Sequence, residues 1–256
     1  MTGRGLSPMI FSPAGKDNHP VHIKGFLFDT VGVFVDFDKT WAPALTVVAR
    51  EIAAGDAALA AHDLAVAGYD PEADAFMPGS IWAAGNTIDL VEAWLPQGDA
   101  ATRAQMATRV DGYCAQCEPV PVLPVDQLQD VFGGLRAAGF QLAVATNDSS
   151  ISARRTVDRF GLIEHFDLVM GYDSVANPKP AADPILKFAS EHGHSVDQLA
   201  MVGDNLHDAE MARAAGARLA IGVLSGNATR RELTGHVDHI LNDITEVEGL
   251  LASLTP

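Results

Sequence analysis

Three aspartates stand where predicted strands of this 256-residue chain end. Asp29 directly follows an apolar run at 23–28, and Asp204 follows another at 199–202, with Asp208 four residues further along. In an open parallel sheet, ligands bind at the carboxyl ends of the strands, so these carboxylates are expected to meet at one edge. Singly, Asp204 or Asp208 could simply cap a helix. Together with Asp29, they predict a ligand site.

A hydroxyl, an amide and a lysine are expected at the same edge. Thr146 and Asn147 follow the predicted strand at 140–145, and Lys179 lies in the loop after the strand near 166–170. Any one of these could be an ordinary surface residue. Their appearance after successive strands, beside the three acids, is difficult to obtain by chance and strengthens the prediction of a ligand site.

The elements that must position these residues alternate along the chain. Apolar residues between 128 and 135 have the spacing of a helix face, and Gly139 is placed to end that helix. Further helices are expected at 184–192 and 208–215, and a further strand at 219–223. Strands that alternate with helices form βαβ units. The predicted fold class is therefore α/β, a doubly wound parallel sheet with helices on both faces.

The segment from 40 to 120 interrupts this alternation. It contains helical patterns and turn signals but no convincing strand. We interpret it as an all-helical cap domain at 40–120, inserted into a core made of residues 21–39 and 121–256. Residues 1–20 are rich in Gly, Pro and Ser and lack the apolar stretch of a secretory signal, which predicts a flexible N-terminal tail.

Net charge narrows the range of partners. The formal charge of −16 argues against nucleic acid and against anionic membranes, because their phosphates would be repelled. No apolar run approaches the roughly 18 residues that a membrane helix needs. We expect a cytoplasmic protein, and its oligomeric state is not indicated. An acidic protein that bound a phosphate ester would have to supply positive charge locally.

Two cysteines, Cys114 and Cys117, have the spacing of a redox pair or of half a zinc site. A zinc site needs further ligands, and no second pair of cysteines or histidines at a suitable spacing lies nearby. Two unpaired thiols in a reducing cytosol are therefore expected.

The strand-end segments resemble motifs I to IV of the haloacid dehalogenase (HAD) superfamily, in the family's order and from residue 23 onward. Motif IV is matched by G-D-x-x-x-D at 203–208, motif III by K-P-x-x-D-P at 179–184, and motif II by Thr146-Asn147. The helical insert after motif I resembles the cap of the phosphoglycolate-phosphatase-like subgroup. The resemblance implies a HAD-like Rossmannoid core with a helical cap.

The same resemblance implies a Mg²⁺-dependent phosphatase that acts on a small phosphorylated metabolite, with phosphoglycolate as the substrate that the subgroup suggests. Asp29 would attack phosphorus and form an aspartyl-phosphate. Hard oxygen ligands would hold Mg²⁺: Asp29, Asp204, Asp208 and the backbone carbonyl of Val31. The phosphoryl oxygens would be held by Thr146, Asn147 and Lys179. Of these, Thr146 and Lys179 would also act with Asp29 in catalysis. Lys179 would also supply the local positive charge.

Motif I departs from the family pattern D-x-D-G-T. Here it reads Asp29-Thr30-Val31-Gly32-Val33, so the second acid is replaced by Val31. In phosphatases of this family that acid protonates the leaving oxygen and then activates water, and valine can do neither. The Val31 carbonyl could still serve the metal.

Several interpretations stay open at this point. The chain could be a phosphatase of reduced rate, in which another acid or water substitutes. The true motif I could instead lie at Asp36-Phe37-Asp38-Lys39-Thr40, which fits D-x-D-x-T. A 2-haloacid dehalogenase would also lack the second acid, although such enzymes generally lack the motif IV present here. A non-catalytic relative that binds a phosphorylated ligand or a partner protein is the fourth possibility.

Residues of the insert would select the substrate. The candidates in the sequence are few: Arg50, Trp82, Trp94 and Arg103. His207, inside motif IV, is expected to be exposed and to take no part in catalysis.

Overall fold

The centre of the molecule is a six-stranded parallel sheet. The computed structural model describes residues 22–73, 75–77 and 79–254, so the predicted tail at 1–20 lies outside the described residues. The strands follow the order β5-β4-β1-β6-β7-β8, and every neighbouring pair is parallel. Their bounds are β1 Gly25–Phe28, β4 Gln141–Ala145, β5 Leu168–Met170, β6 Leu199–Gly203, β7 Leu219–Val223 and β8 His239–Leu241. The predicted doubly wound α/β class is confirmed.

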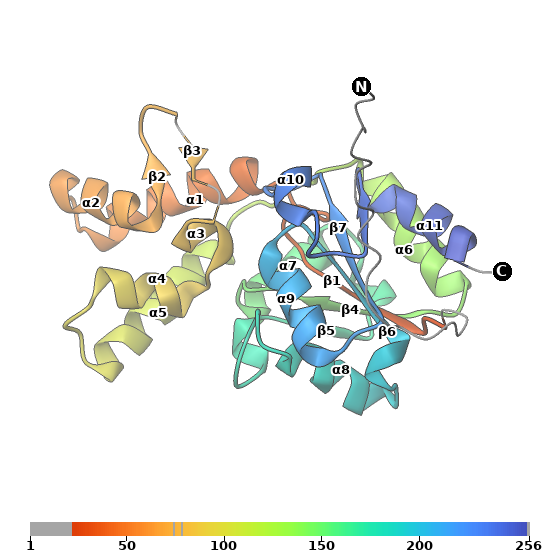
Figure 1. The fold of residues 1–256 in the computed structure, drawn as a ribbon. Coiled ribbons are helices and arrows are strands. Elements are labelled where there is room, and N and C mark those ends of the chain that lie inside the picture. The colour runs from red at the N-terminus through yellow and green to blue at the C-terminus, as the bar shows by residue number, and fades with distance from the viewer. Residues whose placement is uncertain (1–21, 74, 78, 255–256) are drawn as a thin grey trace, which may run out of the picture.

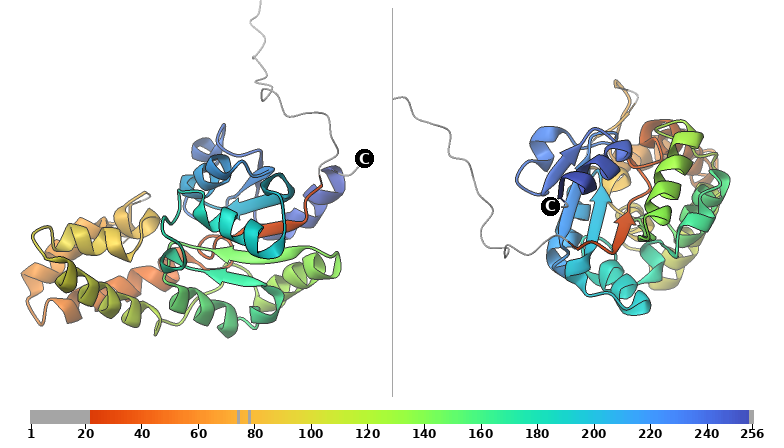
Figure 2. Two further views of the ribbon diagram at one scale, coloured as in Figure 1. Left: turned by 90° about the horizontal axis from the view of Figure 1, so that it is seen from below. Right: turned by 90° about the vertical axis from the view of Figure 1, so that its right-hand side faces the viewer.

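Helices cover both faces of this sheet (Figures 1 and 2). The helices of the core are α6 Val125–Ala137, α7 Ser150–Arg159, α8 Asp183–His192, α9 Leu206–Ala215, α10 Arg230–Leu233 and α11 Val247–Leu254. Residues of α6, α7 and α11 join the buried cluster on one face, whereas residues of α8 and α9 join the cluster on the other.

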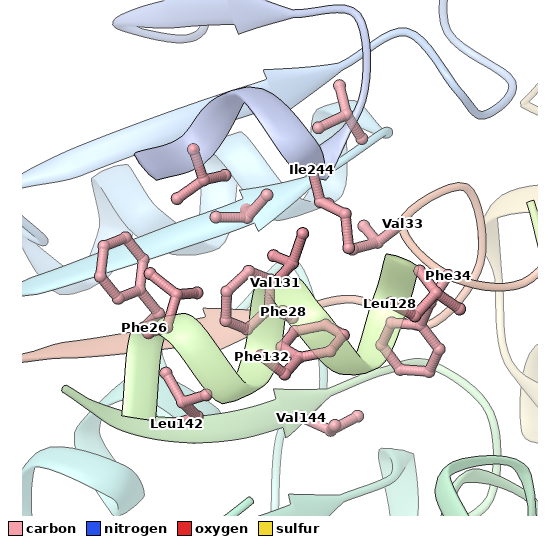
Figure 3. Packing of buried hydrophobic residues seen from close by; sticks show 14 of the residues in the cluster. Phe26, Phe28, Val33, Phe34, Leu128, Val131, Phe132, Leu142, Val144 and Ile244 are labelled. Carbon is pink, nitrogen blue, oxygen red and sulfur yellow. The ribbon is translucent and has the colours of Figure 1, made fainter. Parts of the chain in front are cut away.

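Alternation along β1 explains why the sheet has two separate cores. Phe26 and Phe28 point to the face covered by α6, while Leu27, between them, belongs to the opposite cluster. Figure 3 shows Phe26 and Phe28 among the apolar residues of α6, and the rings of Phe28 and Phe132 meet edge to face at 5.1 Å. Because both faces of the central strands β1, β6 and β7 are buried, these strands read as continuous apolar runs in the sequence.

The helix α6 forms as its apolar spacing predicts. Its buried side chains are Leu128, Val131, Phe132 and Leu135. Gly139, with φ of +91°, follows the end of the helix. A residue with a Cβ would be strained in that left-handed conformation, so glycine allows the chain to leave α6 and enter β4.

A helical insert, residues 37–114, lies beside the sheet (Figure 1). Its elements are α1 Phe37–Ile52, α2 Ala57–Ala67, β2 Tyr69–Asp70, β3 Ala75–Phe76, α3 Ile81–Ala84, α4 Thr87–Trp94 and α5 Ala100–Cys114. It buries an apolar cluster of its own, distinct from the two clusters on the opposite faces of the sheet. This separate core supports the proposed division into core and cap, with α1 beginning at Phe37.

The insert is not helical throughout. β2 and β3 pair in antiparallel fashion, so the expectation that this segment contains no strand needs correction. The pair is held by a turn in which the Asp70 carboxylate accepts from the backbone of Glu72 and Ala73, and by contact between the rings of Tyr69 and Phe76. Strands of two residues are too short to show alternation in a sequence.

Within the part of the chain that the structure describes, none of the helices combines the length and apolar character needed to cross a membrane.

Candidate active site

The three predicted aspartates meet at the carboxyl ends of adjacent strands. β1 lies between β4 and β6, so the loop after β1, which carries Asp29, is next to the loop after β6, which carries Asp204. Asp208 is in the first turn of α9. One carboxylate oxygen from each lies within 4.8 Å of the others, and all three side chains are buried.

Lys179 lies within the same cluster. Its Nζ is 2.9 Å from Oδ2 of Asp29 and 2.7 Å from Oδ1 of Asp208, and its side chain is only 4% exposed. Burial alone would lower the pKa of this lysine, but the attraction of Asp208 and Asp29 outweighs burial and raises the pKa above its ordinary value. Lys179 is therefore a fixed positive charge beside Asp29.

One lysine does not balance three carboxylates. Burial, followed by the charges of Asp29 and Asp208, raises the pKa of Asp204 to about 8. Burial likewise raises the pKa of Asp208, against the opposing effect of Lys179. Such a cluster of buried, converging carboxylate oxygens is suited to a hard divalent cation, which would restore the charge balance. The donor set fits Mg²⁺.

Glycines bring the backbone close to this cluster. A Cβ on Gly32 or Gly226 would overlap the carboxylate of Asp204, and one on Gly203 would overlap that of Asp208. The backbone N–H of Asn227 also donates to Oδ2 of Asp204 at 2.6 Å. Sequence analysis identified Gly32 and Gly203 as parts of motifs but missed the loop at 225–227, which follows β7 and was detectable only by its glycine and its place after a strand.

Thr146 and Asn147 lie at the end of β4, beside Asp29 and Lys179. Oγ1 of Thr146 is 2.9 Å from Oγ1 of Thr30. Nδ2 of Asn147 donates to the backbone carbonyls of Lys179 and Ala84, at 3.2 and 3.3 Å, while its Oδ1 is buried without a partner. Asn147 therefore positions the Lys179 loop, and its amide N–H groups are engaged in doing so.

Asp148 is an acid of the site that sequence analysis did not single out. It follows Asn147, is half-buried, and lines the same cleft as Asp29. Burial, and then the negative charges of Asp29 and Asp111, raise its pKa to about 7. A carboxyl group with this pKa carries a proton in about half of the molecules at neutral pH. Only its position directly after Thr146-Asn147 could have drawn attention to it.

The alternative motif at Asp36-Asp38 does not fit the structure. Asp36 is the N-cap of α1, where its carboxylate accepts from the backbone N–H of Lys39 at 3.1 Å and pairs with the Lys39 ammonium. Asp38 is exposed in the first turn of that helix. Neither is among the acids that converge beside Lys179, and Asp29 occupies the strand end.

The insert contributes apolar residues to the lining of the cleft that the core acids also line: Phe37, Trp41, Ile81 and Trp82. The two indole rings meet at 85° with centroids 6.4 Å apart, and Nε1 of Trp82 donates to the carbonyl of Trp41. Nε1 of Trp41 is itself buried and has no hydrogen-bond partner.

Of the four substrate-selecting candidates, Trp82 is the one that the structure places in this cleft. Arg103 instead donates to the carbonyls of Leu95 and Pro96, within the insert. Nε1 of Trp94 donates to the carbonyl of Asp63. Arg50 is exposed in the last turn of α1. The expectation for these three is wrong because they serve the insert's own loops and surface.

His207 also differs from expectation. It is half-buried, and its Nδ1 lies 2.9 Å from the carbonyl of Ala84, the last residue of α3. The Ala84 carbonyl thus receives both His207 and Asn147 from the core. The reason is local: carbonyls at a helix C-terminus lack partners within the helix and take donors from outside.

A second link between insert and core is built on Asp111 of α5. Its carboxylate accepts from the hydroxyl of Thr87 at 2.6 Å and from that of Tyr172, a core residue, at 2.7 Å. Asp111 lines the cleft as well. Cys114, the last residue of the same helix, is buried, and Cys117, in the turn that follows, is half-buried. Both are free thiols, and burial raises the pKa of each.

Comparison with known proteins gives a consistent result. The family described as haloacid dehalogenase-like hydrolase matches residues 23–216. A "probable phosphatase IndB" of Dickeya dadantii is 40% identical over 121 residues, which are 47% of this chain and about half, 52%, of that protein. Phosphoglycolate phosphatase of Salmonella typhi is 30% identical over 209 residues, covering 76% of this chain and 79% of the relative.

Among solved structures, a protein described as a "predicted phosphoglycolate phosphatase" from Haemophilus somnus is similar over 90% of this chain and 98% of its own. The TM-score is 0.64 at 18% identity. At that identity the likeness concerns the fold.

Proposed function

Because the chain belongs to the haloacid dehalogenase-like hydrolase family, we propose that it hydrolyses a small phosphate monoester, with Mg²⁺ as cofactor and Asp29 as nucleophile. The observation that carries this proposal is the buried contact of Asp29 with Lys179, beside Asp204 and Asp208. Relatives named as phosphatases support the reaction class. A dehalogenase would not require three carboxylates that hold a cation, since its substrate brings no phosphoryl charge for that cation to neutralise.

In the first step, a carboxylate oxygen of Asp29 attacks phosphorus and the alcohol leaves, which gives an aspartyl-phosphate. Lys179 and the hydroxyl of Thr146 hold the phosphoryl oxygens. Mg²⁺ would be bound by the carboxylates of Asp29, Asp204 and Asp208 and by the backbone carbonyl of Val31. Its charge would neutralise that of the phosphate. In the second step, water attacks the same phosphorus and frees Asp29.

The leaving alcohol needs a proton that Val31 cannot give. Asp148 is the acid that we assign to this task. It lines the cleft beside Asp29, and the raised pKa of about 7 leaves it protonated in about half of the molecules at neutral pH. After donating its proton to the alcohol, the Asp148 carboxylate can accept one from the attacking water, which restores its starting form.

The replacement of the motif I acid by Val31 favours a second candidate function, a binding protein that retains the site without turnover. Hydrolysis of 4-nitrophenyl phosphate separates the two, since 4-nitrophenolate is a stable anion that leaves without a proton. We expect Mg²⁺-dependent release of nitrophenolate by the wild type and none by Asp29→Asn. Asp36→Asn, an acid outside the cluster, is the matched control and is expected to remain active. No Mg²⁺-dependent turnover by the wild type would favour the binding protein.

A further inference from the structure

The cleft offers little positive charge to a substrate. Among the described residues that line it, Lys179 is the only lysine or arginine, and its ammonium already lies between Asp29 and Asp208. That single cation, with a bound Mg²⁺, serves the phosphoryl group. The described residues by which the insert lines the cleft include no lysine or arginine that could receive a second anionic group.

Toward the insert, carboxyl groups line the cleft. Asp111 lines the cleft and is held in place by hydrogen bonds from Thr87 and Tyr172. Asp148 lines the same cleft, and the charges of Asp29 and Asp111 both act on it. A carboxylate on the substrate, such as that of phosphoglycolate, would be brought among carboxyl groups.

Much of the remaining wall on the side of the insert is apolar and aromatic. Phe37 and Trp41 come from α1, and Ile81 and Trp82 from α3, with Val31 at the border to the core site. Such a surface favours an apolar group on the substrate, and a ring in particular, because flat aromatic walls bury a flat ligand well.

One of these cleft-lining residues carries an unpaired polar atom. Nε1 of Trp41 is a hydrogen-bond donor, the residue is only 3% exposed, and the atom has no partner. Leaving a buried N–H unpaired is unfavourable, so such a donor in a cleft marks the place where a ligand supplies an acceptor. The neighbouring indole of Trp82 needs no ligand, because it donates to the carbonyl of Trp41.

We propose that the substrate is the phosphate monoester of an uncharged alcohol that carries an apolar ring and a hydrogen-bond acceptor, which is received by Nε1 of Trp41. Phosphorylated carboxylic acids are poor substrates because the Asp111 carboxylate opposes the second negative charge. This inference rests on the proposed function and specifies its substrate class.

A set of matched esters tests the proposal: 4-methoxybenzyl phosphate, 4-ethylbenzyl phosphate, 4-carboxybenzyl phosphate and phosphoglycolate. The first two have similar shapes and differ in the acceptor, and the third adds a negative charge. With wild-type protein and Mg²⁺, we expect kcat/KM for the methoxybenzyl ester to exceed that for the two carboxylates at least tenfold. Asp111→Asn is expected to raise kcat/KM for the carboxybenzyl ester about fivefold or more.

Trp41→Phe keeps a ring and removes the donor. We expect it to lower the ratio of kcat/KM for methoxybenzyl over ethylbenzyl phosphate by about three- to tenfold, the range of one neutral hydrogen bond. Trp94→Phe is the control, since its indole donates to Asp63 away from the cleft, and it is expected to leave that ratio unchanged.

Two results would overturn the inference while leaving the proposed function intact. One is turnover of phosphoglycolate or the carboxybenzyl ester as efficient as that of the methoxybenzyl ester. The other is a ratio that Trp41→Phe does not alter. If no ester is hydrolysed, the proposed function fails. In that case, binding of each ester to Asp29→Asn is measured by the quenching of tryptophan fluorescence. The inference requires a lower Kd for 4-methoxybenzyl phosphate than for phosphoglycolate.

Discussion

Replacing Asp148 by asparagine removes the proton donor while the nucleophile, the lysine and the metal ligands stay in place. Burial and the charges of Asp29 and Asp111 raise the pKa of Asp148 from 3.8 to about 7. At pH 7 about half of the molecules then carry the proton, compared with about one in 1,600 for an unperturbed carboxyl. General acids contribute about 10²–10⁴ in rate, so a loss of that size is expected on substrates that need a proton.

The assay compares two leaving groups through kcat/KM, which reports the transfer of the phosphoryl group to Asp29. For 4-methoxybenzyl phosphate, whose alkoxide is a poor leaving group, Asp148→Asn should lower kcat/KM by about 10²–10⁴. For 4-nitrophenyl phosphate the loss should be less than about tenfold, since the phenolate leaves unprotonated. Asp158→Asn, an exposed aspartate of α7, is the control.

The pH profile gives an independent measure. A general acid acts only while it carries its proton, so wild-type kcat/KM on the alkyl ester should fall as the pH rises above about 7. Val31→Asp, which installs the acid of motif I, should restore much of the activity of Asp148→Asn. Equal losses on the alkyl and nitrophenyl esters would refute the reasoning and give Asp148 a structural role. So would an unchanged pH profile in Asp148→Asn.

Other substitutions test the remaining parts of the site. Asp204→Asn should abolish the increase in Tm that Mg²⁺ gives the wild type, because one of three charged ligands is lost; an unaltered Mg²⁺ shift would contradict the metal assignment. Brief exposure to an activated phosphate ester should leave an acyl-phosphate on the peptide that contains Asp29, as mapped by mass spectrometry, and a label on Asp36 would contradict the assignment of the nucleophile. Asp36→Ala removes the N-cap of α1 and should lower the free energy of unfolding, measured with denaturant, by about 1 kcal/mol, while kcat on 4-nitrophenyl phosphate is retained. Tyr172→Phe removes a hydrogen bond between the insert and the core, so it should raise KM for 4-methoxybenzyl phosphate more than it lowers kcat; a selective loss of kcat would argue against this link.

Much of the sheet could be predicted from the sequence because its strands are buried on both faces. β7 spans the residues 219–223 that its apolar run indicates, and α8 begins one residue before its predicted start at 184. β8 was missed. It has three residues, lies at the edge of the sheet, and is preceded by polar residues, so neither length nor periodicity distinguishes it from a loop.

Some residues of the site could likewise be predicted from the sequence, and others could not. Residues placed directly after a strand, such as Asp29 and Asp204, could be predicted because the topology alone brings strand ends together. The raised pKa of Asp148 could not be predicted, since it depends on burial and on the charges of Asp29 and Asp111, which other elements bring near. The donor of Trp41 was equally hidden, because only the packing of α1 against α3 shows that its N–H has no partner.

The two donors on the Ala84 carbonyl, together with the Tyr172–Asp111 contact, bear on conformational exchange. Three hydrogen bonds hold the insert against the core at the cleft. At about 0.5–1.5 kcal/mol each, they contribute about 1.5–4.5 kcal/mol to holding the insert against the core. If breaking them were the whole cost of opening, an open form would hold between roughly one in ten and one in two thousand of the molecules and would exchange in microseconds to milliseconds. Substrate would thus enter by selecting a form that the free protein already visits, and closure would draw Asn147 and His207 onto one carbonyl while it excludes water from Asp29.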